Sequence, residues 1–218
     1  MKRKARRLQY AGVIVLLLFA VLYTKEEITL AGNESSRFGV IQALGEQGVF
    51  HIERTNFAST VDRVEWNGHV YSDKPLPLSS AAAVVHGTVH RLTGINFSEN
   101  RMLAIYLINL RFSGGCNILL FLWMFRLLRR TCRGRIEVKW LLALAMCLST
   151  WLLTYSVIFN NHTPAALAVL GLLEPITGIA LPLTRFTAFC AGVFCGGQAL
   201  AVLFSAAARS CSGSMSAG

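Results

Sequence analysis

Leu8-Gln-Tyr-Ala-Gly-Val-Ile-Val-Leu-Leu-Leu-Phe-Ala-Val-Leu-Tyr23 is an apolar run interrupted only by Gln9. At about 1.5 Å per residue, a helix over this run is about 24 Å long and approaches the roughly 30 Å of a hydrocarbon core. The run fits either a cleavable signal peptide or a membrane anchor. Because the residues after Tyr23 offer only a weak cleavage site, we favour an uncleaved anchor.

The composition extends this assignment to the rest of the chain. The 218 residues are 54% hydrophobic with a mean hydropathy of +0.50, which is too apolar for an ordinary soluble domain. We therefore expect an all-α polytopic membrane protein of about five transmembrane helices, with a small external α/β segment between the first two spans. The further apolar runs cover residues 101–125, 140–159, 164–183 and 186–208.

The charges predict the orientation. Five basic residues lie in Lys2 to Arg7 and six in 126–139, all beside apolar runs, whereas nine of the eleven acidic residues lie between Glu26 and Glu99. Lys and Arg beside spans mark the cytoplasmic side. We expect an integral protein of the inner, cytoplasmic membrane with its N-terminus in the cytoplasm. The net charge of +10 arises from basic residues beside apolar runs rather than from a groove-lining patch. We therefore expect the lipid bilayer as a partner, and no nucleic acid.

These patterns divide the chain into four parts. Residues 1–24 form a basic N-terminus and membrane anchor, and residues 25–100 form an external loop with surface helices and a short hairpin. Residues 101–208 form transmembrane helices. Residues 209–218 form a disordered tail, because they are small and polar.

The external loop contains three further local patterns. Residues 33–48 predict an amphipathic helix on the membrane surface, with Phe38 and Ile41 on its apolar face and a glycine at its end. Residues 49–54 alternate between apolar and polar and predict a strand. Residues 78–92 predict a second surface helix.

Between those helices lies a polar run that begins at Asn67-Gly68. Both positions tolerate positive φ, so the pair predicts a two-residue hairpin turn, and alternation before and after it predicts two short strands. Asp73 and Lys74 follow, and two prolines then redirect the chain. Spacing alone leaves open whether this is a solvated surface hairpin or the rim of a site.

A family resemblance extends this pattern. The first span, the Asn-Glu-Ser-Ser-Arg-Phe sequence from Asn33, the Glu-Gln-Gly that ends at Gly48 and the Asn-Gly-His-Val-Tyr-Ser-Asp-Lys-Pro run from Asn67 resemble the N-terminal region of GT-C glycosyltransferases. The similarity is to bacterial relatives of the protein mannosyltransferase and aminoarabinose transferase families. It implies a polytopic enzyme that moves a sugar from a polyprenyl-phosphate donor to an acceptor on the outer side of the membrane.

The resemblance also implies two catalytic residues. Glu34 matches an acidic residue of the family that accepts the acceptor's proton or helps to hold a divalent cation. Asn33 stands where many relatives have Asp, which leaves one acidic side chain. Asp73 and Lys74 match the Asp-Lys-Pro element, with Asp73 orienting the loop or sugar and Lys74 binding the lipid phosphate. From residues alone, a carboxylate that complements a helix dipole is the better explanation of Glu34.

Four further residues are assigned to donor or phosphate binding. Arg37 is a candidate phosphate ligand or a surface ion pair, and His69 belongs to the same polar run as Asp73. Asn161 and His162 match a Tyr…Asn-Asn-His pattern of the resembling family, although a polar turn that caps the next helix explains them too. No metal ligands are assigned. His86 and His90 lie four apart but are interpreted as interfacial histidines.

Enzymes of this family have many more spans than five, so a truncated, inactive gene product is one interpretation. The alternative function is a non-catalytic envelope membrane protein whose external loop binds a partner. A transporter subunit is disfavoured because the spans hold few charged residues besides Arg111 and Glu174. These two residues are hypothesised to pair.

Overall fold

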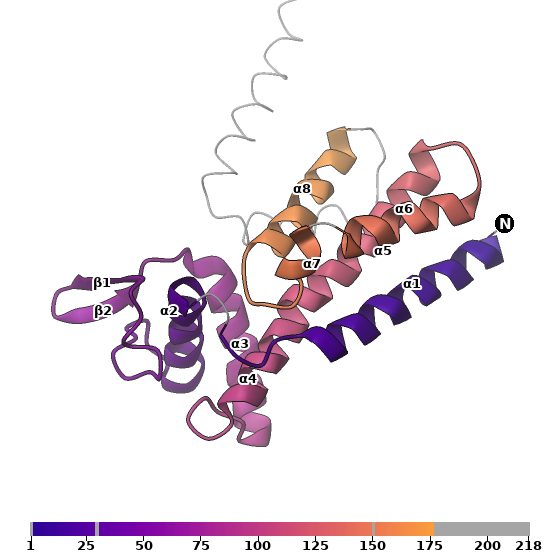
Figure 1. Ribbon diagram of the computed structural model, residues 1–218. Coiled ribbons are helices and arrows are strands. Elements are labelled where there is room, and N and C mark those ends of the chain that lie inside the picture. Colours follow the sequence, from indigo (N-terminus) through magenta and orange to yellow (C-terminus); the bar gives the residue numbers. More distant parts are fainter. Residues whose placement is uncertain (1, 29–30, 150, 177–218) are drawn as a thin grey trace, which may run out of the picture.

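The computed structural model describes residues 2–28, 31–149 and 151–176. Within them the chain is mostly helical, with one two-stranded sheet (Figure 1). The expected fifth span at 186–208 and the tail at 209–218 lie outside the described residues. The hypothesised pair of Arg111 and Glu174 also involves a side chain outside those that the structure describes.

Two helices are long and apolar enough to cross a membrane. The first is α1 (Lys2–Tyr23), and the second joins α4 (Arg101–Asn109), the π-helical turn η2 (Leu110–Gly114) and α5 (Gly115–Thr131). Most of the apolar residues of α1 are exposed on the protein, as expected for a helix whose surface contacts lipid. They include Tyr10, Ile14, Leu17, Leu18 and Leu22.

The expected third span is wrong as a continuous helix. Residues 140–159 are divided between α6 (Ile136–Leu148) and α7 (Trp151–Tyr155), and α8 (His162–Ile176) follows. After α7 the backbone is not helical, and other segments satisfy its polar groups: the Ser113 hydroxyl donates to the carbonyl of Ile158 at 2.5 Å, and the N–H of Lys25 donates to Val157 at 2.9 Å. Five spans are therefore not shown in the described residues.

The segment 25–100 is built around α2 (Ala31–Gln42), which continues as the π-helical turn η1 (Ala43–Gln47) and ends at Gly48 with φ 74°. The sequence predicts that its apolar face lies on a membrane surface, but this face packs inside the protein instead. Phe38 and Ile41 are fully buried against α3 (Leu76–Thr93) and α4, because these helices offer a matching apolar face that water would otherwise contact. The rest of this core comprises Phe57, Leu78, Ala82, Ala83, Phe97, Ala104, Ile105, Ile108 and Phe159.

The predicted hairpin is confirmed. Strands β1 (Arg63–Trp66) and β2 (His69–Ser72) pair antiparallel, and Asn67 and Gly68 turn with φ of 51° and 77°. The register places Arg63 opposite Ser72.

The predicted strand at 49–54 is wrong. One strand-like hydrogen bond forms, from the N–H of Ile52 to the carbonyl of Val70 at 2.8 Å. The chain then turns, because the N–H and the hydroxyl of Thr55 both bond to the carbonyl of Ile52.

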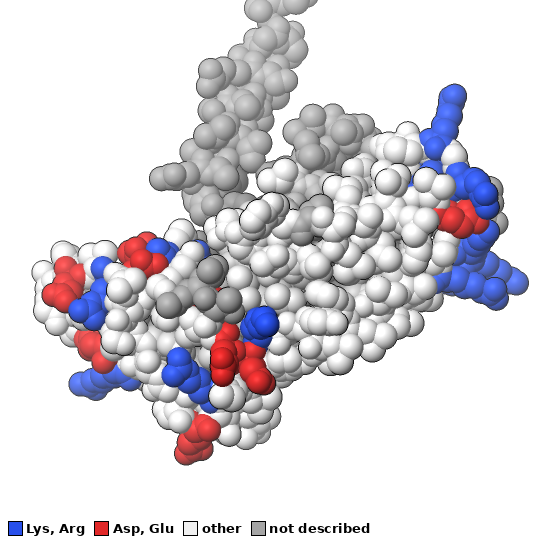
Figure 2. Space-filling view, viewed as in Figure 1, with Lys and Arg blue, Asp and Glu red and all other residues white. Residues whose placement is uncertain are grey.

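The charges separate along the molecule. On the face shown in Figure 2, Lys and Arg gather at the end of α1 that carries the N-terminus, and charges of both signs cover the segment 25–100. The surface between them carries few charges. At the basic end, Lys4 forms an ion pair with Glu137 of α6, which ties the start of α1 to the bundle.

Candidate functional site

The first part of the candidate site is the N-terminal half of α2. Glu34 and Arg37 lie three residues apart on this helix and are 1% and 3% exposed. The Arg37 Nε donates to Asn33 Oδ1 at 3.0 Å. Burial of the guanidinium lowers the pKa of Arg37, and the nearby Asp73 carboxylate opposes that shift. Buried ionic groups carry a desolvation cost, so their retention favours a role beyond a surface ion pair.

The second part is the open end of the hairpin, which is fastened to α2 through two serines. The hydroxyls of Ser36 and Ser72 lie 2.6 Å apart, and the Ser36 hydroxyl also lies 2.6 Å from the carbonyl oxygen of Asp62. The N–H of Lys74 donates to the Ser72 hydroxyl at 3.1 Å. These contacts fix the backbone that carries Asp73 and Lys74 against the buried helix.

Lys74 stands between two carboxylates. Its Nζ lies 2.9 Å from Asp62 Oδ2 and 3.2 Å from Asp73 Oδ1, and the hydrogen bond to Asp62 is the main reason that its pKa is raised. The site thus holds three acidic side chains, those of Glu34, Asp62 and Asp73. It holds two basic ones, those of Arg37 and Lys74. A phosphate at Lys74 would meet an ammonium already paired with two carboxylates, although one of its three N–H donors is left for it.

Sequence reasoning missed Asp62. Extending the observed register by one pair beyond Arg63 and Ser72 places Asp62 opposite Asp73. Like charges opposite each other in a hairpin repel, and Lys74, paired with both, offsets part of that repulsion. This signal was available once the turn at Asn67-Gly68 had been placed.

His69 lies at the other end of β2, in a different cluster. Its Nδ1 is 2.6 Å from Oε1 of Glu53, and Nδ1 of His51 is 3.1 Å from the same oxygen. The N–H of Val70 donates to Oε2 of Glu53 at 3.3 Å. The hydrogen bond with His69 is the main reason that the pKa of Glu53 falls to about 2. These three side chains form the group with metal-ligand geometry in the part of the chain that the structure describes.

Asn161 and His162 lie at the start of α8. The N–H of His162 donates to Asn160 Oδ1 at 2.7 Å, and the carbonyl of Asn161 accepts from Ala165 at 2.9 Å. The ring of His162 lies 4.2 Å from that of Tyr155. These contacts are those of a polar turn that caps a helix, and they belong to α7 and α8 rather than to the hairpin.

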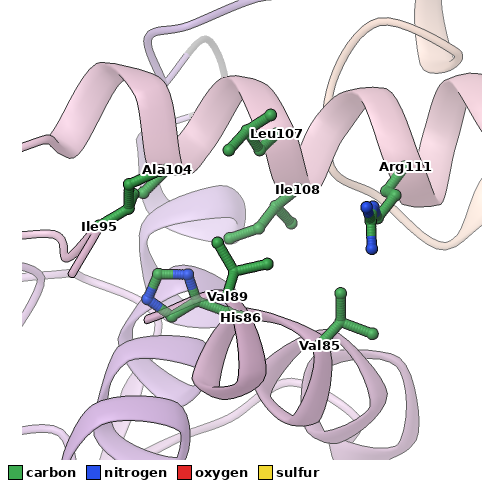
Figure 3. A pocket seen from close by; sticks show the side chains of 8 residues that line it. All are labelled: Val85, His86, Val89, Ile95, Ala104, Leu107, Ile108 and Arg111. Carbon is green, nitrogen blue, oxygen red and sulfur yellow. The ribbon is translucent and has the colours of Figure 1, made fainter. Parts of the chain in front are cut away.

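A small apolar cavity lies between α3 and the α4–η2 helix (Figure 3). Its volume of about 40 Å³ suits a few waters, whereas ligand pockets commonly measure roughly 300–1,000 Å³. It is therefore no sugar site. Its lining residues are Val85, His86, Val89, Ile95, Ala104, Leu107, Ile108 and Arg111.

The interpretation of His86 as an interfacial histidine is wrong. It is buried, and its Nε2 lies 2.9 Å from Glu46 Oε1. His90 bonds instead to the carbonyl of Ile95 through Nδ1 at 3.1 Å. The two histidines therefore have separate partners within the fold.

No protein-family model matches this sequence, and neither the curated proteins nor the solved structures contain a match.

Proposed function

We propose that this chain acts as a membrane glycosyltransferase, moving a sugar from a polyprenyl-phosphate donor to an acceptor on the outer side of the membrane. The observation that carries the proposal is the docking of the hairpin's open end on α2. It brings Asp73, which contacts Lys74, near Arg37, and both Arg37 and Glu34 of that helix are buried. Such a cost in desolvation is characteristic of functional sites.

Each side chain has a role in this proposal. As the acceptor O–H or N–H attacks the sugar C1, Glu34 takes the proton, and the bond from C1 to the phosphate oxygen breaks. Arg37 and Lys74 stabilise the negative charge on the departing polyprenyl phosphate. Asp73 orients the sugar and holds Lys74 at 3.2 Å.

The test uses the full-length protein in lipid nanodiscs with polyprenyl phosphates that carry hexoses or pentoses. Loss of the donor and release of polyprenyl phosphate are followed by mass spectrometry. We expect Glu34→Gln to lower the rate about 10²- to 10⁴-fold, the usual range for a general base. Lys74→Gln should weaken donor binding. Glu65→Gln is the matched control, because Glu65 lies on the exposed face of β1.

A non-catalytic envelope protein whose external loop binds a partner is the second candidate. The exposed apolar side chains of Val61, Val64 and Trp66, which are 85%, 51% and 65% exposed, favour it. A wild-type protein that neither binds nor turns over the donor would exclude the transferase and leave this candidate. Replacing Trp66 with Ser should then abolish partner capture while leaving the fold intact.

A further inference from the structure

We propose that His51, Glu53 and His69 bind one divalent transition-metal ion, and that Zn²⁺ is the ion their donor set fits best. The site is separate from Glu34, Asp73 and Lys74, so the inference goes beyond the proposed transferase activity.

The donor atoms already converge. The two Nδ1 atoms lie 2.6 Å and 3.1 Å from one carboxylate oxygen of Glu53, and all three ligand atoms lie within 4.8 Å of one another. Zinc binds imidazole nitrogen and carboxylate oxygen at about 2.0–2.2 Å. Tetrahedral ligand atoms at that radius lie roughly 3.3–3.5 Å apart, so small side-chain rotations suffice to admit the ion.

One of the three atoms has no hydrogen bond without a metal. Nδ1 of His51 is shielded from solvent and makes no hydrogen bond, although the Glu53 oxygen is near, because that contact lacks hydrogen-bond geometry. A buried polar atom without a partner costs free energy. A metal ion would give this nitrogen a partner and would also replace the crowding of two imidazoles on one oxygen.

The backbone holds the ligands in place from two directions. His51 and Glu53 stand two residues apart on the segment before the turn at Thr55, and His69 begins β2. The N–H of Ile52 bonds to Val70 at 2.8 Å, and that of Val70 bonds to Glu53 Oε2 at 3.3 Å. The metal would therefore clip the 49–55 segment to the hairpin.

The ligand chemistry selects the ion. Two histidines and one carboxylate suit zinc, cobalt, nickel or iron rather than Mg²⁺ or Ca²⁺, which prefer oxygen ligands. Three protein ligands leave a fourth tetrahedral position for water. The His51 and His69 rings are stacked with centroids 4.7 Å apart, an arrangement that places both nitrogens on the same side of the hairpin.

The test titrates purified full-length protein in detergent, after removal of metal with a chelator, with Zn²⁺ and with Co²⁺. We expect one equivalent of Zn²⁺ to bind, Co²⁺ to give the visible absorption of a tetrahedral site, and Mg²⁺ to leave zinc binding unchanged. His51→Gln, Glu53→Gln and His69→Gln should each weaken zinc binding at least about a hundredfold. His90→Gln is the matched control and should retain it.

Two results would overturn the inference: a wild-type protein that takes up no Zn²⁺ at one equivalent, or a His51→Gln/His69→Gln double variant that binds as tightly as the wild type. Far-ultraviolet circular dichroism checks that each variant folds, and the wild-type titration does not depend on any variant. Because the readout is metal binding, its failure leaves the transferase assay unaffected.

Discussion

Glu46 Oε1 accepts from two segments at once: Nε2 of His86 lies 2.9 Å away, and the N–H of Phe97 lies 2.8 Å away. The carboxylate thereby joins η1 to α3 and to the loop that precedes α4. The His86 side chain is 2% exposed and that of Glu46 is 10% exposed. This pair closes the core of the segment 25–100 beside the cavity of Figure 3.

Glu46→Ala should destabilise the segment 25–100 strongly. The substitution leaves the His86 ring and the Phe97 N–H buried without their acceptor, at a cost of about 2–4 kcal/mol. Thermal unfolding of the detergent-solubilised protein, followed by circular dichroism, measures the loss. Glu99→Ala is the control, because residue 99 is exposed. Equal stabilities for the two variants would mean that the Glu46 contacts contribute little.

The same carboxylate predicts an acid-dependent loss of stability. Burial alone would raise the pKa of Glu46, but hydrogen bonds from His86 and Phe97 outweigh it and lower the pKa below its usual 4.5. A carboxylate whose pKa is lower in the folded protein than in the unfolded chain stabilises the fold. This contribution is complete above pH 4.5 and is lost as the pH falls through the pKa of the folded protein. Denaturant unfolding between pH 6 and pH 3 should therefore show a steeper acid loss in the wild type than in Glu46→Gln. Parallel curves would contradict this.

A close backbone contact between α3 and η1 gives a third prediction. A Cβ placed on Gly87 would lie 2.7 Å from the carbonyl oxygen of Gly45, so Gly87→Ala must push the two elements apart. We expect a loss of about 1–3 kcal/mol. Gly115→Ala is the matched control, because its Cβ would meet nothing closer than 4.0 Å. Chemical denaturation of both variants decides whether the contact is as tight as described.

The parts of the fold that depend on local signals could be predicted from the sequence. The helix at 2–23 follows from one apolar run, and the hairpin follows from Asn67-Gly68, whose positive φ values few other pairs accept. The end of α2 at Gly48 is local for the same reason. In each case neighbouring residues decide the backbone, so no distant partner is needed.

The errors arose where a distant partner decides the structure. The non-helical backbone after α7 is held by hydrogen bonds from Ser113 and Lys25 to 157–158, which no local pattern reveals. The alternation at 49–54 predicts a strand, but Glu53 turns to His69 instead. The membrane-surface placement of α2 failed because the apolar face of α3 covers it.

The candidate site divides in the same way. Asp73 and Lys74 were found because they follow a recognisable turn, and Glu34 and Arg37 because of the resemblance. The pairing of Lys74 with Asp62 follows from strand register, and the grouping of His51 with His69 follows from the single bond between Ile52 and Val70. Both require the tertiary arrangement.

The proposed orientation gives the last prediction. In a cysteine-free background, Val61→Cys introduces a thiol at an 85% exposed position beside β1, and restoring the native Cys132 places an exposed thiol in the turn between α5 and α6. If the basic end faces the cytoplasm, a membrane-impermeant maleimide added to intact spheroplasts should label position 61. It should reach position 132 only after permeabilisation. The reverse pattern would invert the topology, and it would place the buried Arg37 and Glu34 on the side of the membrane opposite to the one that the transferase proposal requires.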